Sequence, residues 1–454
     1  MSTNHLSQFL EQITFSDLSA KSVEEAKNAV IDTLGICIRG SSYESSKVIY
    51  SCLETINTDS DDKSGLWGLD QKASSTEAAF YNSATAHTVE MDDWHRDGTV
   101  HPGCVVIPAA LAIAEAINAS GKDLLVAIAS GYEIVARIGM AAQGTQQERG
   151  FHPTGTCGVF GAAAAAGKLY GLSKQQLNMA FGIAGSFTGG LLEYQSNGAW
   201  TKRLNPASAT KAGVYAAKLA EAGFIGPETI LEGKAGFLKA YSNSYSLEII
   251  DNLSSKDTLQ IEKISRKPYP SCRHTHAAID AILNIFSKSD IAIEDIKEIN
   301  VESYDRVIEA TMRPEERKYR PQSQVDGQFS LPFCLALAVY YREIAPEYFS
   351  EEFFKQNKLL ELTSKVKASA TKELNDLYPA QNPARVIVKT GSAEYSNTVY
   401  DPKGDPENPL TAEMIDNKFI MLAKPVIGQA KSKSLLEALH HLEQLKTIRD
   451  LSSS

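Results

Sequence analysis

The chain has 454 residues, 43% of them hydrophobic and 22% charged, which is typical of a soluble globular protein long enough for two domains. Its formal net charge of -10 argues against nucleic acid as a partner, because no surplus of basic residues is present to neutralise phosphates. The six cysteines stand singly without a CxxC pair, and neither a secretory signal nor an uninterrupted apolar run for a membrane span is present, so we expect a cytoplasmic protein with no membrane partner.

Helices dominate the expected secondary structure up to about residue 260. Apolar residues recur at helical spacing in one segment after another, and the segments are rich in alanine and glycine, which let helix backbones approach closely. This pattern predicts a large all-helical domain with several buried helices. It is carried by residues 21–38, 108–120, 123–143, 173–187 and 208–224.

After about residue 260 the sequence pattern changes from helical spacing to a mixture of strand and helix patterns. Residues 297–308 (IKEINVESYDRV) have the alternation of a strand, and 384–401 (ARVIVKTGSAEYSNTVYD) contain two β-rich runs around a glycine turn, which predicts a hairpin. Helical patterns lie between them. We therefore expect a smaller α+β domain over 266–402, and a mainly α protein overall.

The C-terminal segment returns to helical spacing after the turn-rich stretch DPKGDPENP at 401–409. We expect it to pack back on the helical domain. The predicted domains are thus a discontinuous helical one, 1–265 with 403–454, and the α+β one, 266–402.

Residues 149–171 (RGFHPTGTCGVFGAAAAAGKLYG) resemble a phosphate loop only at first sight. Five alanines separate Gly161 from Gly167, no strand precedes them, and a leucine stands where a P-loop needs a hydroxyl. The stretch instead predicts a tightly packed helix with Thr154 or Thr156 as its N-cap. His152 then lies in the preceding loop, beside unpaired backbone N–H groups that favour bound anions.

Titratable residues are concentrated in the loop HTVEMDDWHRDGTVHPG, which precedes an apolar helix. Such density predicts an active-site loop, although each carboxylate taken alone is equally well explained as a cap or a surface charge. No HExxH or HxxEH pattern accompanies the histidines, so we expect neither a metal ion nor another cofactor. The titratable residues of the loop are His87, Glu90, Asp92, Asp93, His95, Arg96, Asp97 and His101.

Three basic segments lie at other helix entrances. Lys202 and Arg203 occur in GAWTKRLNP, Lys267 and Arg273 in SRKPYPSCRHTH, and Tyr319 lies between two basic residues in ERKYRPQ. Together with the histidines they favour a small polyanionic substrate. Carboxylates fit better than phosphates, because no glycine-rich cradle accompanies the cations.

Several stretches, in one order from about residue 30 to 425, resemble the MmgE/PrpD family, whose members include 2-methylcitrate dehydratase, cis-aconitate decarboxylase and iminodisuccinate epimerase. Met91-Asp92-Asp93-Trp94 departs from the Asn-Asp-Thr-Trp motif of the dehydratases, and Asn205 stands where family members often have histidine. The stretches are HTVEMDDWHRDGTVHPGCVVIPAALAIAEA, GFHPTGTCGVFGAAAAAGKLYGL, GIAGSFTGGLLEY, GAWTKRLNP, KPYPSCRHTHAAIDA, GQFSLPFCLALAV and YDPKGDPENPLT.

The resemblance implies a large helical domain built from both chain ends, a smaller α+β lid domain, a homodimer and catalysis without metal. By motif position it implies site residues Asp93, His101, His152, Lys202 and Lys267, with Tyr319 as a further match.

The shared chemistry is proton transfer at a carbon next to a carboxylate. We expect His101 and His152 to act as base and acid in an order that the sequence leaves open, and Asp93 to orient one of them. Lys202, Lys267 and Arg273, with Arg203 and Tyr319, would bind the substrate.

The favoured function is a metal-independent lyase that resembles cis-aconitate decarboxylase. The alternatives are an epimerase of an iminodisuccinate-type dicarboxylate, a 2-methylcitrate dehydratase-like lyase and a non-catalytic polyanion-binding protein.

Overall fold

A computed structural model describes residues 1–53, 62–196, 198–254 and 257–453. The chain forms two compact units: unit 1 comprises Met1–Ser265 and Thr411–Ser454, and unit 2 comprises Arg266–Leu410. Residues 403–410 therefore belong to unit 2 and not, as predicted, to the helical unit. The reason is local, because the Arg273 guanidinium binds Asp405 at 2.6 Å and the Lys403 N–H donates to Asp280 at 2.7 Å.

Unit 1 is mainly helical, as predicted. Among the described residues, unit 1 also contains a short antiparallel pair of strands that was not predicted from the sequence. The strands are β1 (Lys63–Gly65) and β2 (Lys72–Ser74). The helices are α1 (Ser2–Gln12), α2 (Ala20–Ser41), α3 (Glu44–Ser51), α4 (Ser75–Ala86), α5 (Gly103–Ile117), α6 (Gly121–Ala141), α7 (Thr145–Glu148), α8 (Pro153–Leu169), α9 (Lys174–Ala184), α10 (Thr201–Glu221), α11 (Phe237–Tyr241), α12 (Glu248–Asp251), α21 (Ala412–Ile427) and α22 (Gln429–His440).

The small residues of α8 let its neighbours approach closely. A Cβ added at Gly161 would lie 2.9 Å from the Val135 side chain of α6, and one at Gly213 of α10 would lie 2.5 Å from the Val159 carbonyl oxygen of α8. Substitution at either position would force the helices apart. α8 thus lies between α6 and α10 and packs closely on both.

The start of α8 differs from the prediction. His152 itself is the N-cap residue and Pro153 occupies the first helical position, where proline lacks only an N–H that has no helical partner. Thr154 Oγ1 instead accepts from the backbone N–H of His101 at 3.1 Å, and Thr156 donates to Gln146. Near the other end of α8, Lys168 donates to the Leu10 carbonyl at 2.7 Å.

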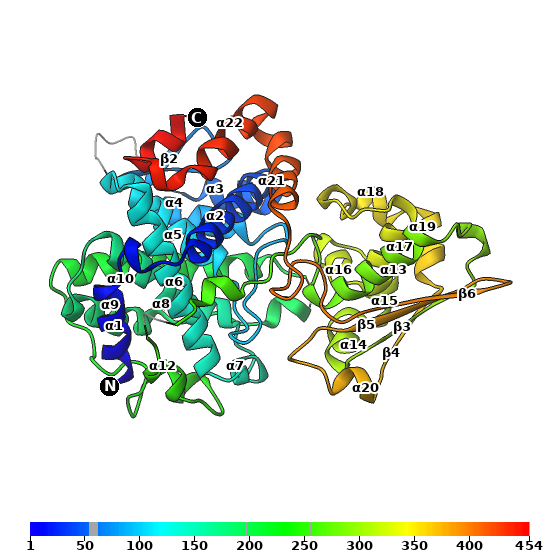
Figure 1. Cartoon of the computed structure of the whole chain (residues 1–454), viewed down its shortest axis with the longest axis horizontal. Helices are drawn as coiled ribbons and strands as arrows, with labels where there is room; N and C mark the ends of the chain where they lie inside the picture. Colours follow the sequence, from blue (N-terminus) through cyan, green and yellow to red (C-terminus); the bar gives the residue numbers. More distant parts are fainter. Residues whose placement is uncertain (54–61, 197, 255–256, 454) are drawn as a thin grey trace. The chain divides into compact units, whose positions relative to one another are not determined.

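Helix α6 is long and apolar enough to cross a membrane by length and composition, but 94% of that window is buried inside the protein. It is a core helix of unit 1. The two chain ends meet in the same unit, since α21, drawn in red-orange, packs against the blue α2 (Figure 1). The ion pair of Lys418 with Asp32, at 2.6 Å, joins these two helices in their buried contact.

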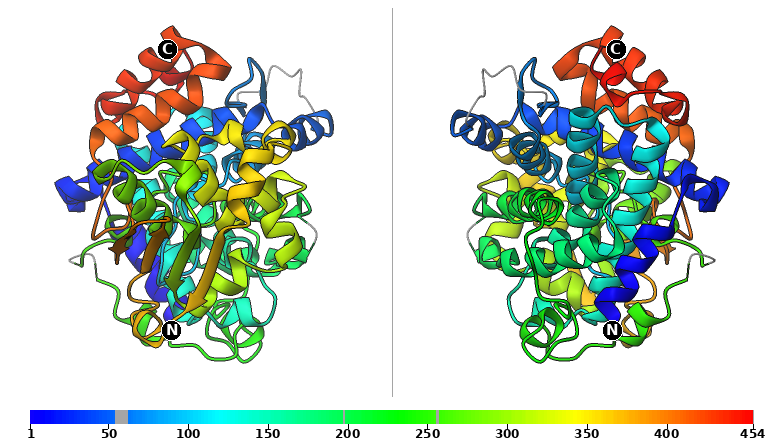
Figure 2. Two further views of the ribbon diagram at one scale, coloured as in Figure 1. Left: turned by 90° about the vertical axis from the view of Figure 1, so that its right-hand side faces the viewer. Right: turned by 90° about the vertical axis from the view of Figure 1, so that its left-hand side faces the viewer.

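Unit 2 contains the predicted α+β fold, with a four-stranded sheet in the order β4-β3-β5-β6 (Figure 2). The predicted hairpin is present as β5 (Ala384–Lys389) and β6 (Glu394–Val399), with Val386 opposite Asn397. β3 (Glu298–Ser303) runs antiparallel to β5 and parallel to β4 (Val366–Ala370), a strand that the sequence reading missed.

Helices α13 and α17 contribute more residues to the apolar core of unit 2 than its other helices do, and α13 packs on β5 and β6. The helices of this unit are α13 (His276–Lys288), α14 (Asp305–Thr311), α15 (Glu315–Tyr319), α16 (Gln324–Gln328), α17 (Leu331–Tyr341), α18 (Glu351–Phe354), α19 (Asn357–Thr363) and α20 (Lys372–Asn375).

Candidate active site

The titratable loop connects α4 to α5 in unit 1 and turns inward. His87 directly follows the last residue of α4, and Glu90 adopts a left-handed backbone with φ of 63°, which is uncommon for a residue other than glycine. The backbone N–H of His101 donates to Thr154, so the end of the loop is tied to the first turn of α8. Strained, buried backbone of this kind is concentrated at functional sites.

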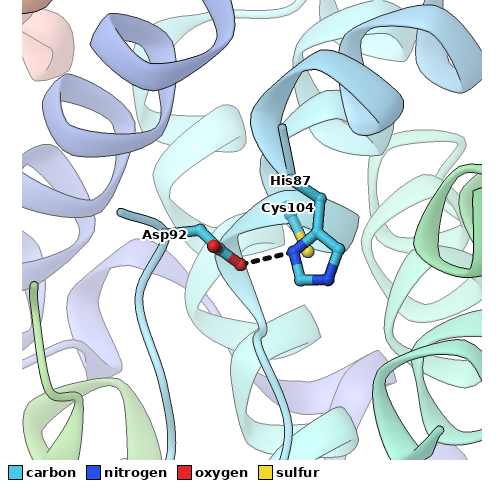
Figure 3. Close-up of side chains that lie close together, drawn as sticks. All are labelled: His87, Asp92 and Cys104. Atoms are coloured by element: carbon cyan, nitrogen blue, oxygen red, sulfur yellow. Dashed lines mark hydrogen bonds and ion pairs between the residues drawn. The ribbon is translucent and has the colours of Figure 1, made fainter. Parts of the chain in front are cut away.

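One carboxylate oxygen of the loop contacts two of its histidines. Asp92 Oδ2 lies 2.7 Å from His87 Nδ1 and 3.1 Å from His101 Nδ1 (Figure 3 shows the first contact). These two imidazoles hold the pKa of Asp92 well below its usual value in spite of the burial that opposes them. Asp92 is therefore a carboxylate that accepts from both rings.

Three imidazole rings gather around it. The ring of His87 meets His101 edge-on at 5.1 Å between centroids and stacks on His152 at 5.6 Å with an interplanar angle of 26°. Burial lowers the pKa of His87 to about 4, although Asp92 raises it. Burial first, and then the neighbouring imidazoles and the Lys202 ammonium, lower the pKa of His152 well below its usual value. Both rings are thus neutral near pH 7.

The proton of His101 is located by its partners. Nδ1 faces the Asp93 carbonyl oxygen at 2.6 Å and Asp92 Oδ2 at 3.1 Å, and both of these atoms only accept. Nδ1 therefore carries a hydrogen, and Nε2 is the nitrogen that has the lone pair in the corresponding neutral tautomer. With 16% of its side chain exposed, His101 is open to solvent where His87 and His152 are buried.

His152 has the opposite arrangement. Its Nδ1 lies 3.1 Å from Asn205 Nδ2, and the same amide nitrogen donates to the Leu191 carbonyl at 3.1 Å, which fixes the orientation of the amide. Nδ1 of His152 thus accepts, and the hydrogen of the neutral ring is on Nε2. The site therefore presents one imidazole with a bare Nε2 and another with a protonated Nε2.

Lys202 provides the cation of the site. It lies in the first turn of α10, is 8% exposed, and its ammonium group forms an ion pair with Glu90. Arg203 is adjacent and buried, and it donates to Ser45 Oγ at 2.7 Å. Burial lowers the pKa of Arg203 to about 10, so the guanidinium keeps its charge at neutral pH.

Asp93 does not direct its carboxylate at either histidine. Oδ1 accepts from the Gly103 N–H at 2.8 Å and Oδ2 from the Tyr132 hydroxyl at 2.6 Å, so the side chain holds the start of α5. Its burial raises its pKa to about 6. The predicted orienting role belongs to the Asp93 backbone carbonyl, which accepts from His101, and the carboxylate that contacts the imidazoles is Asp92.

The other predicted residues lie in unit 2. Lys267 is 1% exposed, and the Tyr319 hydroxyl donates to the Val366 carbonyl at 2.9 Å. The Arg273 guanidinium binds Asp405 and also donates to the carbonyls of residues 402 and 403, which holds the connector. A substrate-binding role for these three residues stays a prediction.

The described part of the chain brings three potential metal ligands within 4.8 Å of one another, His87, Asp92 and Cys104 (Figure 3). In the structure two of them are joined by a hydrogen bond. Asp92 Oδ2 already accepts from two imidazoles, so the His87 proton occupies the position between nitrogen and oxygen. Burial also raises the pKa of the Cys104 thiol well above its usual value, which disfavours the thiolate.

The structure brings the predicted residues His101, His152 and Lys202 close together. The residues that surround them were not assigned a role from the sequence. Glu90, Asp92 and His87 stood in the motif without an assigned role, and Asn205 was noted only as a departure from the family pattern. The left-handed φ of Glu90 and the contact of Asn205 with His152 have no signature in a single sequence.

Two family models match the chain: the MmgE/PrpD N-terminal domain over residues 4–250 and the MmgE/PrpD C-terminal domain over residues 269–444. Cis-aconitate decarboxylase of Homo sapiens is 28% identical over 460 residues, which cover 94% of this chain and 89% of that protein. The enzyme of the same name from Aspergillus terreus is 26% identical, covering 99% and 94%, and that of Mus musculus is 27% identical, covering 93% and 87%. The resemblance inferred from the motifs is confirmed.

Proposed function

Because the chain belongs to the MmgE/PrpD family, we propose that it is a lyase acting on a small di- or tricarboxylate, with cis-aconitate as the first candidate substrate. The similarity to proteins named cis-aconitate decarboxylase, at 26–28% identity over nearly the whole chain, supports this choice of substrate. The reaction needs a group that gives a proton to carbon and a cation that stabilises the developing negative charge.

One observation carries the proposal: His101 and His152 lie in one site, and acceptors face Nδ1 of His101 whereas an amide donor faces Nδ1 of His152. The bare Nε2 of His101 suits a proton acceptor, and the Nε2–H of His152 suits a proton donor. The order of base and acid that the sequence left open is thereby proposed, with His101 as base and His152 as acid.

In the proposed decarboxylation, the bond between a CH₂ carbon and its carboxylate breaks and carbon dioxide leaves. The electron pair moves through the adjacent double bond to the carbon next to another carboxylate, where His152 Nε2–H delivers a proton. His152 regains that proton from solvent, so the net reaction consumes one proton and releases one carbon dioxide. Lys202 stabilises the negative charge on the substrate and exchanges its partner Glu90 for a substrate carboxylate.

An epimerase is the second candidate, and the same pair of tautomers favours it. A base that removes a proton from one face and an acid that returns one to the other face are what inversion next to a carboxylate requires. The two candidates differ in their products, since epimerisation keeps every carboxylate and decarboxylation loses one.

The test is a panel of di- and tricarboxylates followed by NMR in deuterated water. The proposal predicts loss of carbon dioxide from cis-aconitate, with deuterium at the carbon next to a remaining carboxylate. Deuterium exchange with inversion and without carbon loss would establish the epimerase instead. Saturable binding of the panel with neither exchange nor turnover would leave a polyanion-binding protein.

A further inference from the structure

A cavity of about 580 Å³ lies in unit 1 and is lined by the turn that joins β1 to β2, by the end of α5 and by the C-terminal helices α21 and α22. Small-molecule sites usually measure about 300–1,000 Å³. Glu115 lines the cavity, whereas Gly103, at the start of the same helix, binds Asp93 in the candidate active site. An α-helix rises about 1.5 Å per residue, so about 18 Å of α5 separates the two places.

Apolar side chains form most of the cavity lining, among them Leu66 of the turn and Leu435 of α22. The exposed residues of the lining carry charges of both signs, since Lys72 and Lys431 are opposed by Asp70. Apolar walls with a few polar groups are typical of a site for a small organic molecule. The mixed charges favour a molecule that is itself uncharged.

Glu115 is the buried polar group of this cavity, with 2% exposure. Its Oε2 accepts from Ser64 Oγ and from the Gly65 N–H, both at 2.7 Å, whereas Oε1 is buried without a partner among the described residues. Burial raises the pKa of Glu115, although these two donors lower it. A hydrogen-bond donor from a ligand would pair with Oε1 and stabilise the charged form.

Trp67 provides the complementary group, because its indole N–H is also buried without a partner in the described part of the chain. Its position is fixed from α4, where Asn82 Oδ1 accepts from the Trp67 backbone N–H at 2.9 Å and Asn82 Nδ2 donates to the Gly65 carbonyl at 2.9 Å. An indole N–H can only donate, so it needs an acceptor. The cavity thus offers one acceptor and one donor that do not bind each other.

We propose that this cavity binds a small, uncharged, mainly apolar molecule with a cyclic amide edge, whose N–H donates to Glu115 Oε1 and whose carbonyl accepts from Trp67 Nε1–H. A cyclic amide has its donor and its acceptor on neighbouring atoms of a rigid ring, so it supplies both without a net charge. The inference does not depend on the proposed lyase activity, because the cavity and the three imidazoles lie at opposite ends of α5.

Three bicyclic aromatic probes separate the two hydrogen bonds. 2-Quinolinone carries the donor and the acceptor, N-methyl-2-quinolinone has only the acceptor, and indole has only the donor. Each is titrated into the full-length protein by isothermal titration calorimetry. We expect 2-quinolinone to bind with a Kd below about 1 mM, as is usual for a ligand of this size, and the other two to bind at least about tenfold more weakly.

Two substitutions locate the binding. In Glu115→Gln the side-chain carbonyl can keep its bonds to Ser64 and Gly65, so an NH₂ group replaces Oε1, and Trp67→Phe removes the indole N–H while an aromatic ring remains. Each should weaken 2-quinolinone by at least about tenfold. Glu115→Gln should leave N-methyl-2-quinolinone unaffected, and Trp67→Phe should leave indole unaffected. Trp200→Phe is the control, because this exposed tryptophan is not part of the cavity lining and its substitution should change nothing.

The proposal is overturned if 2-quinolinone does not bind, if the three probes bind equally well, or if neither substitution weakens 2-quinolinone. Equal binding would mean that the cavity takes up any apolar ring without using its polar groups. If Glu115→Gln does not fold, Trp67→Phe alone decides, because unchanged affinity for 2-quinolinone in that variant would overturn the proposal. A protein that binds 2-quinolinone as expected but turns over no polycarboxylate would refute the lyase proposal and leave this site intact.

Discussion

Lys202 and Glu90 form a buried ion pair that joins the first turn of α10 to the loop after α4, and Glu90 reaches it from a left-handed backbone conformation. Removing one partner of a buried pair leaves the other charge without compensation. Glu90→Gln should therefore lower the free energy of unfolding by about 3 kcal/mol, measured by urea denaturation. Glu44→Gln is the control, since it breaks the exposed pair with Lys47 and should give no measurable loss. Equal effects of the two substitutions would contradict a buried, coupled pair.

Removal of the proposed acid tests the mechanism directly. His152→Ala should lower kcat by about 100-fold or more, the usual contribution of a positioned general acid. The fold should persist, because the His152 side chain caps no N–H of α8. The comparison is with His5→Ala in α1, which lies outside the site and should keep native turnover. Native-like activity of His152→Ala, with an unchanged circular dichroism spectrum, would remove His152 from the mechanism.

The site residues divide into those that the sequence predicted and those that only the fold reveals. His101, His152 and Lys202 stand next to helix starts within dense motifs, and helix starts bring side chains of distant segments together. Asp92 and Asp93 are neighbours of the same type, and the sequence favoured Asp93 by motif position. Consecutive residues of an irregular loop point in different directions, so Asp92 reaches the imidazoles while Asp93 binds Gly103 and Tyr132.

The same contrast holds for the fold. The hairpin of β5 and β6 was predictable because both strands alternate around a glycine turn within one segment. β4 was missed because VKASA is short and alanine-rich, and its strand form depends on pairing with β3, more than sixty residues earlier in the chain. Local sequence patterns thus predict the helices and the hairpin. They do not predict β4, because its strand form depends on pairing with a distant segment of the chain.

Buried histidines make stability depend on pH. Burial lowers the pKa of His95 to about 4, so its neutral form stabilises the folded protein above pH 6.5, and this contribution is lost as the pH falls toward 4. As the pH falls from 6.5 to 4, the free energy of unfolding of the native protein should fall by about 3 kcal/mol more than that of His95→Asn. The asparagine keeps an acceptor for the Gly98 N–H. Urea midpoints measured across this range test the difference, with the exposed His441→Asn expected to parallel the native protein. Parallel curves for His95→Asn and the native protein would refute the shift.

We predict that the enzymatic activity does not require a metal ion. The proposed decarboxylation uses the His152 imidazole and the Lys202 ammonium group, so dialysis against a chelator should leave the rate on cis-aconitate unchanged, and added Mg²⁺ or Zn²⁺ should not raise it. Inactivation by the chelator that a particular ion reverses would show that the reaction needs that ion.

Asn205 offers the sharpest test of the acid assignment. In the native site its amide donates to His152 Nδ1 and so places the ring hydrogen on Nε2. In Asn205→Asp the new carboxylate can only accept, so the hydrogen of the neutral ring should move to Nδ1 and leave Nε2 bare. We expect kcat to fall by about 100-fold, because the proton donor is lost while the ring remains in place. The ¹⁵N shifts of His152 should exchange their assignment, and those of His101 should not change.

The matched control for this reversal is Asn178→Asp in α9, which introduces the same buried charge where an amide donates to the Glu228 carbonyl, away from the three imidazoles. It should affect stability without moving the His152 proton. If Asn205→Asp kept both native turnover and a protonated Nε2, the hydrogen bond to Asn205 would not be what sets the tautomer, and His152 would lose its claim to be the acid.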